Sequence, residues 1–289
     1  MMKIKNTPLS SNDAGFTLVE LMVGMFVSLI IIGVSLTYLI SASASFKINA
    51  NDGYIQENSR FALTFISRVL RRGGSNSQID LGFETSPVLT DLICSDGPVN
   101  NIACTSTSSG PNNSDRITIA YILADGLTCN GSDISTFYSP DNGERIVDEL
   151  WVATDADGVN NLYCKSSLMT SDGVLVAQGG APPIISGIDM MKFDYAVDTN
   201  DDFRADRYLT IDEIVAGNPV SGNSYEDSIR AIKVGLLVNS GLVGATENNT
   251  EDLVDRVYQI FGVESTALND QVLRQIFSTT IQLPNAPEN

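Results

Sequence analysis

The stretch FTLVELMVGMFVSLIIIGVSLTYLI, from Phe16 to Ile40, contains a single charged residue, Glu20. As a helix it would be about 37 Å long, which exceeds the ~30 Å hydrocarbon thickness of a bilayer and allows some tilt. Lys3 and Lys5 precede it, so the positive-inside rule keeps the N-terminus in the cytoplasm and exports the remainder. The sequence therefore predicts one membrane-spanning helix over residues 16–40.

Three interpretations of this helix are open, and Glu20 helps to separate them. An ordinary secretory signal fits poorly, because its apolar core is shorter and its cleavage site follows that core. A plain uncleaved anchor explains the length but leaves Glu20 unexplained, since an acid in an apolar segment is costly and usually has a partner. Cleavage after Gly15 would create an α-amine on Phe16, and that cation on a neighbouring subunit is a natural partner for Glu20.

The motif G-F-T-L-V-E-L, at Gly15–Leu21, resembles the processing motif of type IV pilins and type II secretion pseudopilins. The resemblance implies that residues 1–15 are a leader and that a prepilin peptidase cuts between Gly15 and Phe16. It also implies that the peptidase methylates the new Phe16 amine and that Glu20 serves assembly.

Residues 41–74 predict a second, amphipathic part of the helix. Apolar pairs recur at spacings of three, four and seven, which marks one stripe of a helix that we expect to pack on the protein's own sheet. Gly73–Gly74 predicts its end, and Asn51-Asp52-Gly53 predicts a kink or break in its middle. The pairs are Tyr54/Ile55, Phe61/Ala62, Phe65/Ile66 and Val69/Leu70.

Residues 75–289 predict a β-rich head, so the fold class is α+β rather than α/β. The stretch Asp155–Gly158 predicts a hairpin turn, and Ile229–Val238 predicts a central strand because its end is wholly apolar. Residues 249–261 predict a short helix or a variable loop, and residues 75–115 predict loops. The expected strands are 116–123, 149–153, 161–165, 173–177, 189–197, 229–238 and 275–283.

Four cysteines, all in this head, allow three pairings. An exported head lies in an oxidising compartment, where disulfides are expected. Proximity in the sequence favours Cys94–Cys104 and Cys129–Cys164, and four buried free thiols are the alternative. No C-x-x-C spacing indicates a redox or zinc motif.

The charge balance excludes several functions. The chain has 17 Lys+Arg against 35 Asp+Glu, a net charge of −18, so we expect the head to bind no nucleic acid directly. It has no histidine, which excludes Ser-His-Asp and Cys-His nucleophiles and His-ligated zinc. We expect no enzyme, and a membrane-anchored periplasmic carboxylate hydrolase is the remaining catalytic alternative.

One acidic stretch places side-chain oxygens at alternate positions, as at the start of a calcium loop. Phe203 stands where such a loop needs glycine and Leu209 where it needs glutamate, so a standard EF-hand is excluded. A looser calcium-binding turn is one hypothesis and a solvated acidic turn is the other, and no further cofactor is predicted. The candidate ligands are Asp198, Asn200, Asp202 and Asp206.

Two C-terminal stretches narrow the resemblance. SIRAIKVGLLVNS, at Ser228–Ser240, and RQIFSTTIQLPN, at Arg274–Asn285, resemble the final strands of the PilW family of minor pilins. That family's last segment commonly ends in Arg-Asn, where this chain has Pro284-Asn285. The J-type pseudopilin of type II secretion shares the architecture and is the alternative.

The resemblance to PilW implies a structural function. Such a protein is anchored in the bacterial inner membrane by one helix, with a periplasmic head, and then enters a pilus fibre at the cell surface. It joins other minor and major pilins to prime assembly and stays at the tip, where it helps display an adhesin. It supports twitching motility, adhesion or DNA uptake.

Overall fold

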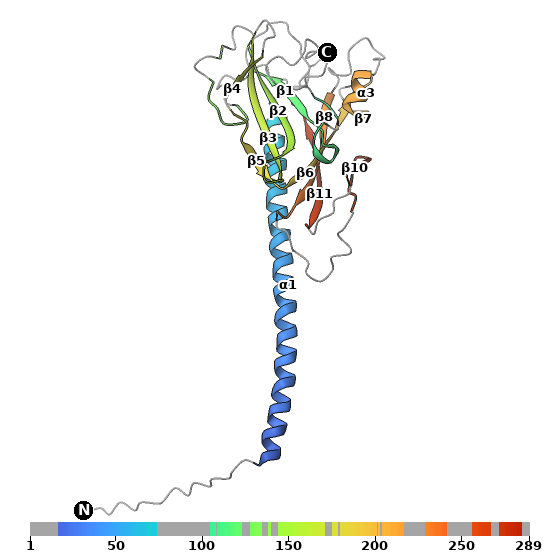
Figure 1. Cartoon of the computed structure of the whole chain (residues 1–289). Coiled ribbons are helices and arrows are strands. Elements are labelled where there is room, and N and C mark those ends of the chain that lie inside the picture. The colour runs from blue at the N-terminus through green and yellow to red at the C-terminus, as the bar shows by residue number, and fades with distance from the viewer. Residues whose placement is uncertain are drawn as a thin grey trace, which may run out of the picture. The chain divides into compact units, whose positions relative to one another are not determined.

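In this computed structural model the chain divides into two compact units, residues 1–47 and residues 48–289 (Figure 1). The predicted leader, 1–15, lies outside the described residues. The structure describes residues 17–73, 105–107, 109–122, 128–134, 138–139, 144–170, 175–178, 180–200, 202, 204–216, 229–241, 256–266 and 272–284.

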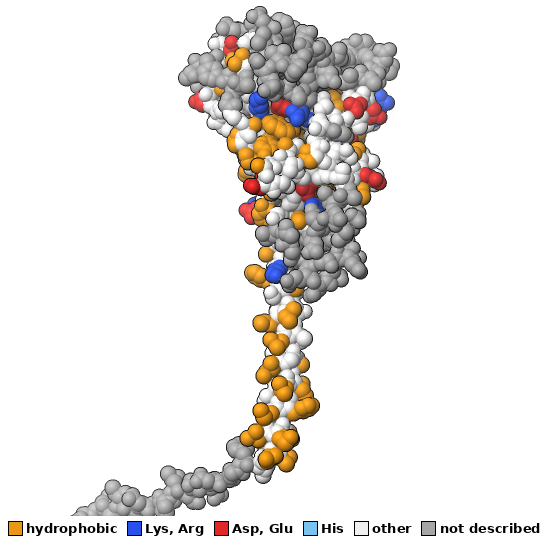
Figure 2. Space-filling model, in the orientation of Figure 1, with side chains coloured by type: hydrophobic (Ala, Val, Ile, Leu, Met, Phe, Trp, Pro, Cys, Tyr) orange, Lys and Arg blue, Asp and Glu red, His pale blue; other side chains and the backbone are white. Residues whose placement is uncertain are grey.

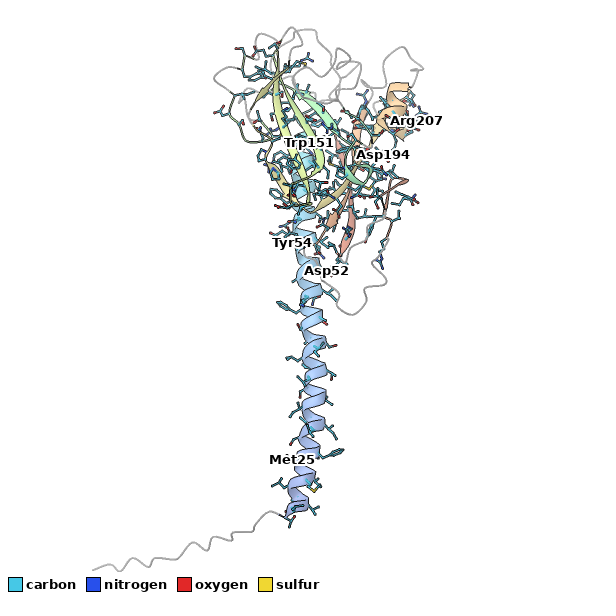
Figure 3. All side chains as sticks on the ribbon, in the orientation of Figure 1. Met25, Asp52, Tyr54, Trp151, Asp194 and Arg207 are labelled. Carbon is cyan, nitrogen blue, oxygen red and sulfur yellow. A yellow bond between two sulfur atoms is a disulfide. The ribbon has the colours of Figure 1, made fainter. Side chains whose placement is uncertain are left out.

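Helix α1 spans Leu18–Leu70. In the first unit its large apolar side chains are all exposed, as the space-filling view shows and as Met25 illustrates at 64% (Figures 2 and 3). Among the described residues this is the one helix long and apolar enough to cross a membrane. The apolar exterior is what a lipid or protein environment would have to cover, in agreement with the predicted membrane-spanning segment.

In the second unit α1 buries one face, and the predicted amphipathic stripe is confirmed. In the pairs Tyr54/Ile55 and Phe61/Ala62 the first residue is exposed and the second is buried, because successive residues lie 100° apart on a helix. The predicted break at Asn51-Asp52-Gly53 is wrong, since the helix continues through it. The buried residues on this face are Asn51, Ile55, Ser59, Ala62, Ile66, Val69 and Leu70.

The first sheet is antiparallel, with the order β1-β2-β3-β4 and with β5 also paired to β3. Asp155 forms the predicted β2–β3 turn by accepting bonds from the N–H groups of Asp157 (3.0 Å) and Val159 (2.9 Å), and Gly158 supplies a positive φ of 80°. The strands are β1 Ile117–Tyr121, β2 Arg145–Thr154, β3 Asn160–Met169, β4 Leu175–Gln178 and β5 Pro183–Ser186.

The second sheet is also antiparallel, with the order β11-β8-β6-β7, so β8 is an interior strand as predicted. A small hairpin of β9 and β10 covers one face of this sheet. There Gly235 on β8 leaves room for Ile260 on β9. The helix considered for 249–261 is wrong over its described part, 256–261. The elements are β6 Ile188–Val197, β7 Arg207–Leu209, β8 Ile229–Asn239, β9 Gln259–Ile260, β10 Val263–Glu264 and β11 Arg274–Gln282, with helices η2 Pro111–Asn113 and α3 Ile211–Ala216.

A buried carboxylate, Asp189 at the start of β6, joins the two sheets. Its Oδ1 accepts bonds from Nδ2 of Asn160 on β3 and from Nδ2 of Asn239 on β8, both at 2.9 Å. Its Oδ2 accepts a bond of 2.6 Å from Nε of Arg274 on β11. This satisfied network holds the first residues of β3 and β11 to one point. The protein is thus α+β, with a helix packed on a β-rich head.

Candidate assembly and processing site

The N-terminal site begins at the edge of the described residues. Gly15 and Phe16, the predicted cleavage pair, lie outside them, and Thr17 is the first residue described. The described part of the site therefore consists of the residues that follow the predicted cut.

Thr17 and Glu20 form a capping box at the start of α1. The Thr17 backbone N–H and hydroxyl both donate to Oε2 of Glu20, at 3.2 and 3.0 Å, and the Glu20 N–H donates to the Thr17 hydroxyl at 3.3 Å. The pattern satisfies backbone N–H groups that a helix start leaves unpaired, and the carboxylate also interacts favourably with the positive end of the helix.

This capping role was missed from the sequence, although the signal is present as T-x-x-E before an apolar run. It has a chemical consequence. Both Glu20 and the neighbouring backbone are exposed, so a cation from another chain can reach the carboxylate. Glu20 is thus held near the first turn by Thr17 and remains open to a second partner.

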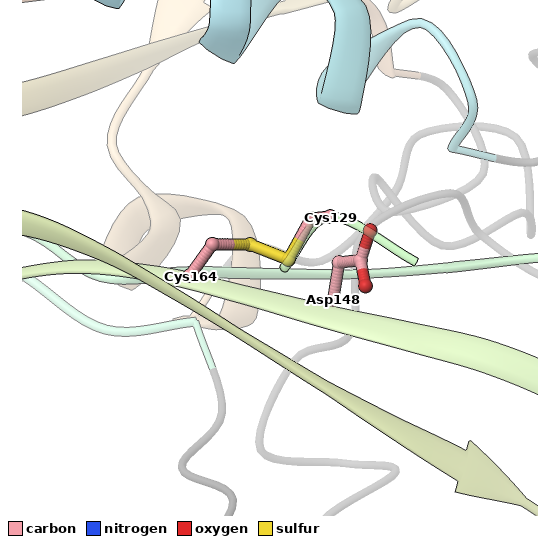
Figure 4. Close-up of side chains that lie close together, drawn as sticks. All are labelled: Cys129, Asp148 and Cys164. Atoms are coloured by element: carbon pink, nitrogen blue, oxygen red, sulfur yellow. A yellow bond between two sulfur atoms is a disulfide. The ribbon is translucent and has the colours of Figure 1, made fainter. Parts of the chain in front are cut away.

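A second cluster lies in the head, around the disulfide Cys129–Cys164. The two Cα atoms are 6.2 Å apart, and this predicted disulfide is confirmed. Cys94 and Cys104, the other predicted pair, lie outside the described residues. Asp148 lies beside the disulfide, and the candidate ligand atoms are all within 4.8 Å (Figure 4). Because the two sulfurs are bonded to each other, they offer no thiolates to a metal.

Asp148 is fully buried on β2 and connects three elements. It accepts a bond of 2.7 Å from the Tyr121 hydroxyl on β1 and one of 2.5 Å from the Ser166 hydroxyl on β3. Arg72, just after α1, lies over the Tyr121 ring at 5.8 Å. Burial raises the pKa of Asp148, while its hydrogen bonds and Arg72 oppose that rise. Sequence patterns did not single out Asp148, because one acid in an exported strand is usually solvated.

The predicted calcium ligands lie on the turn between β6 and β7, where their oxygens bind the backbone. Asp198 is buried and its Oδ2 lies 3.5 Å from Nη2 of Arg230, while its Oδ1 accepts the Asn200 N–H at 3.2 Å. Asp206 accepts bonds from the Thr199 N–H (2.8 Å) and hydroxyl (2.7 Å), and these lower the pKa of Asp206.

The same turn continues with Asn200 Oδ1 accepting the Asp202 N–H at 3.1 Å and Asp202 Oδ1 accepting the Arg204 N–H at 2.9 Å. These are the bonds of successive Asx turns. In the part of the chain that the structure describes, the carboxylates of this turn do not gather into a three-acid group within 4.8 Å. Calcium binding stays a prediction.

Comparisons with known proteins match both the N-terminal segment and the head. Residues 10–36 match the prokaryotic N-terminal methylation motif, and residues 149–285 match the family of the type IV pilus-assembly protein PilW. A type IV-like pilin from Thermus thermophilus is 13% identical, with 80% of this chain and 98% of that chain covered and a TM-score of 0.39. No curated protein matches the sequence.

The methylation motif and the long apolar helix define the class, which is that of the type IV pilin-like proteins. Within that class the chain is a PilW-like minor pilin, because the PilW match runs from the middle of β2 to just beyond β11. Both resemblances noted in the sequence are confirmed. The motif implies processing by a prepilin peptidase and association with other pilins.

Proposed function

We propose that this chain is a minor pilin that helps prime assembly of a type IV pilus. The observation that carries the proposal is the position of Glu20, in the first turn of an exposed apolar helix whose start lies within a methylation motif. A subunit of this design enters a filament by moving an apolar helix from lipid into a bundle of like helices. A tip position beside an adhesin, and support of twitching motility, adhesion or DNA uptake, belong to the same proposal.

The proposed role of Glu20 follows from electrostatics in an apolar medium. After cleavage, Phe16 carries an amine whose charge is costly in lipid, and Glu20 carries the opposite charge. Pairing the Phe16 amine of one subunit with Glu20 of the next satisfies both charges at one contact. Because Thr17 already holds the Glu20 carboxylate near the helix start, the pair needs little further ordering.

The proposed location is the bacterial inner membrane, crossed once by residues 16–40, with the head in the periplasm until the chain enters the fibre. The partners are the prepilin peptidase, other minor and major pilins, and a tip adhesin. The Cys129–Cys164 disulfide supports export of the head, since such bonds persist in oxidising compartments. We propose no catalytic activity, because the PilW family is a structural one.

Mass spectrometry of the mature protein tests this proposal most directly. The expected species begins at Phe16, carries one methyl group on its α-amine and lacks residues 1–15. A chain that retains Met1 in cells with an active prepilin peptidase would overturn the proposal and favour an uncleaved anchor.

A J-type pseudopilin of type II secretion is the second candidate, because it shares the helix and its processing. The PilW match over residues 149–285 favours the pilus. Deletion of the gene decides between them: loss of surface pili and twitching with normal exoprotein secretion is expected. Loss of secretion with normal pili would assign the chain to the secretion system instead.

A further inference from the structure

The edge strands of the two sheets differ greatly in length. In the first sheet β1 has five residues and β4 has four, and in the second sheet β7 has three. β11, the other edge of the second sheet, has nine. A short edge strand offers few unpaired backbone groups, whereas a long one offers a continuous row to any extended chain that meets it.

β11 uses one of its two edges. It pairs with β8 along its whole length, from Arg274↔Asn239 to Gln282↔Ala231. Within the described residues no strand pairs with its opposite edge, and Figure 1 shows β11 in red at the limit of its sheet. Since backbone groups of a strand point alternately to the two sides, about half of those between Gln275 and Gln282 face the unpaired edge.

The side chains of β11 do not protect this edge. Ile276 is 44% exposed, and Ser278, Thr280 and Gln282 are exposed at the next alternate positions. None of these is charged and none is proline, although the chain has 35 acidic and 17 basic residues. Edge strands are normally guarded by charge, proline, a bulge or shortness, and the unpaired edge of β11 has none of these.

We propose that the unpaired edge of β11 binds an extended strand of a neighbouring pilin subunit, so that the second sheet continues into the next head. The inference rests on the proposed function, because a filament brings the heads of different subunits together. Backbone hydrogen bonds supply affinity in such strand addition, and alternate side chains supply selectivity.

The chemistry of β11 also describes its partner. Ile276, Ser278 and Thr280 pair best with β-branched or hydroxyl side chains on the opposite strand. A net charge of −18 repels an acidic segment. The partner strand is therefore neutral or basic, β-branched, and free of proline over about seven to nine residues.

Hydrogen exchange of the full chain in detergent tests whether the edge is open and can accept a strand. The probe is a synthetic peptide with the β8 sequence, IRAIKVGLLVN, because β11 already accepts those side chains on its paired edge. In the free chain, about half of the β11 amides should exchange at least tenfold faster than those of β8. Saturating peptide should slow the fast β11 amides about tenfold. β11 amides as protected as those of β8, or unchanged by peptide, would overturn the inference.

A variant with Ser278→Lys and Thr280→Lys tests the edge in cells. Two added charges should abolish peptide protection and lower the amount of the chain in sheared filaments about tenfold, as edge lysines oppose strand addition. Val176→Lys, on the four-residue strand β4, adds a charge at a similarly exposed site and should leave both unchanged. Thr280→Lys alone replaces the double variant if that one misfolds.

The outcomes separate this inference from the proposed function. Wild-type chain missing from filaments would contradict the minor-pilin proposal itself. Wild-type chain present, together with equal amounts of the folded β11 variant, would overturn only the strand addition.

Discussion

Glu20 has one partner in the single chain and gains another in the proposed filament. We expect Glu20→Val to be cut and methylated normally but to be missing from sheared filaments, because the Phe16 amine of its neighbour then stays unpaired. Intact-mass measurement and quantitative immunoblots of the filament fraction check both halves. Wild-type amounts of Glu20→Val in filaments would contradict the pairing.

Thr17→Ala is the matched control for that variant. It removes the hydroxyl of the capping box, which stabilises a helix start by about 1 kcal/mol, and leaves the Glu20 charge in place. We expect it to enter filaments at near wild-type levels. Equal losses for both variants would mean that the helix start, and not the charge, matters.

Asp148 gives the head a pH dependence of defined sign. Because burial raises its pKa in the folded state above the ordinary value of 3.8, the folded chain holds the proton to a higher pH than the unfolded chain does. The contribution of Asp148 to stability is therefore greatest below the unfolded pKa. It falls as pH rises from there to the raised folded pKa.

We expect Asp148→Asn to remove this effect, because asparagine keeps the shape and stays neutral. The melting temperature of the variant relative to wild type should rise with pH above the unfolded pKa. Each unit by which the folded pKa is raised corresponds to about 1.4 kcal/mol of stability. Thermal melts at several pH values measure this. A difference that stays constant or shrinks with pH would show that ionised Asp148 is well tolerated.

Among the elements, α1 shows how burial overrides local propensity. Gly53 sits within it, where glycine costs about 1 kcal/mol relative to alanine, yet Ile55 and its neighbours on the buried face keep the helix intact. A Cβ at Gly53 would meet nothing within 4 Å. We expect Gly53→Ala to stabilise the chain by about 1 kcal/mol in denaturant unfolding.

Gly241 provides the opposite case for comparison. Its φ is +65°, and an added Cβ would lie 3.4 Å from the Tyr54 ring, which Figure 3 places on α1. Gly241→Ala should destabilise the chain by about 1–2 kcal/mol, since side chains disfavour this conformation. Stabilisation by Gly241→Ala, or destabilisation by Gly53→Ala, would contradict these assignments.

The strands that the sequence predicted are those with strong local signals. Residues 229–238 have an apolar run and residues 155–158 have turn chemistry, and both emerge as β8 and the β2–β3 hairpin. β7 was missed because three residues carry too little periodicity, and β5 was missed because it begins with Pro183, which argues against a strand. The Asp189 and Asp148 networks were missed for another reason, since their partners come from distant strands that only the fold brings together.

At the scale of the whole molecule, the net charge of −18 attracts any cation, so a general stabilisation by divalent salts is expected from screening alone. The calcium hypothesis for the β6–β7 turn predicts more. Calcium ligands are oxygens held at 2.3–2.6 Å in a flexible arrangement, which magnesium cannot use equally well. Thermal melts with calcium and with magnesium at the same concentration therefore separate a bound ion from screening.

If Asp198, Asn200, Asp202 and Asp206 bind calcium, it should raise the melting temperature more than magnesium does, and Asp202→Asn should remove the difference. Asp157→Asn removes the same charge at another exposed turn, the β2–β3 turn. This control variant should retain the difference between calcium and magnesium. Equal shifts with the two ions in the wild-type chain would contradict the site. They would leave the hydrogen bonds of the turn, together with the Asp198–Arg230 ion pair, as the role of these oxygens, because each residue already binds a backbone N–H within its own turn.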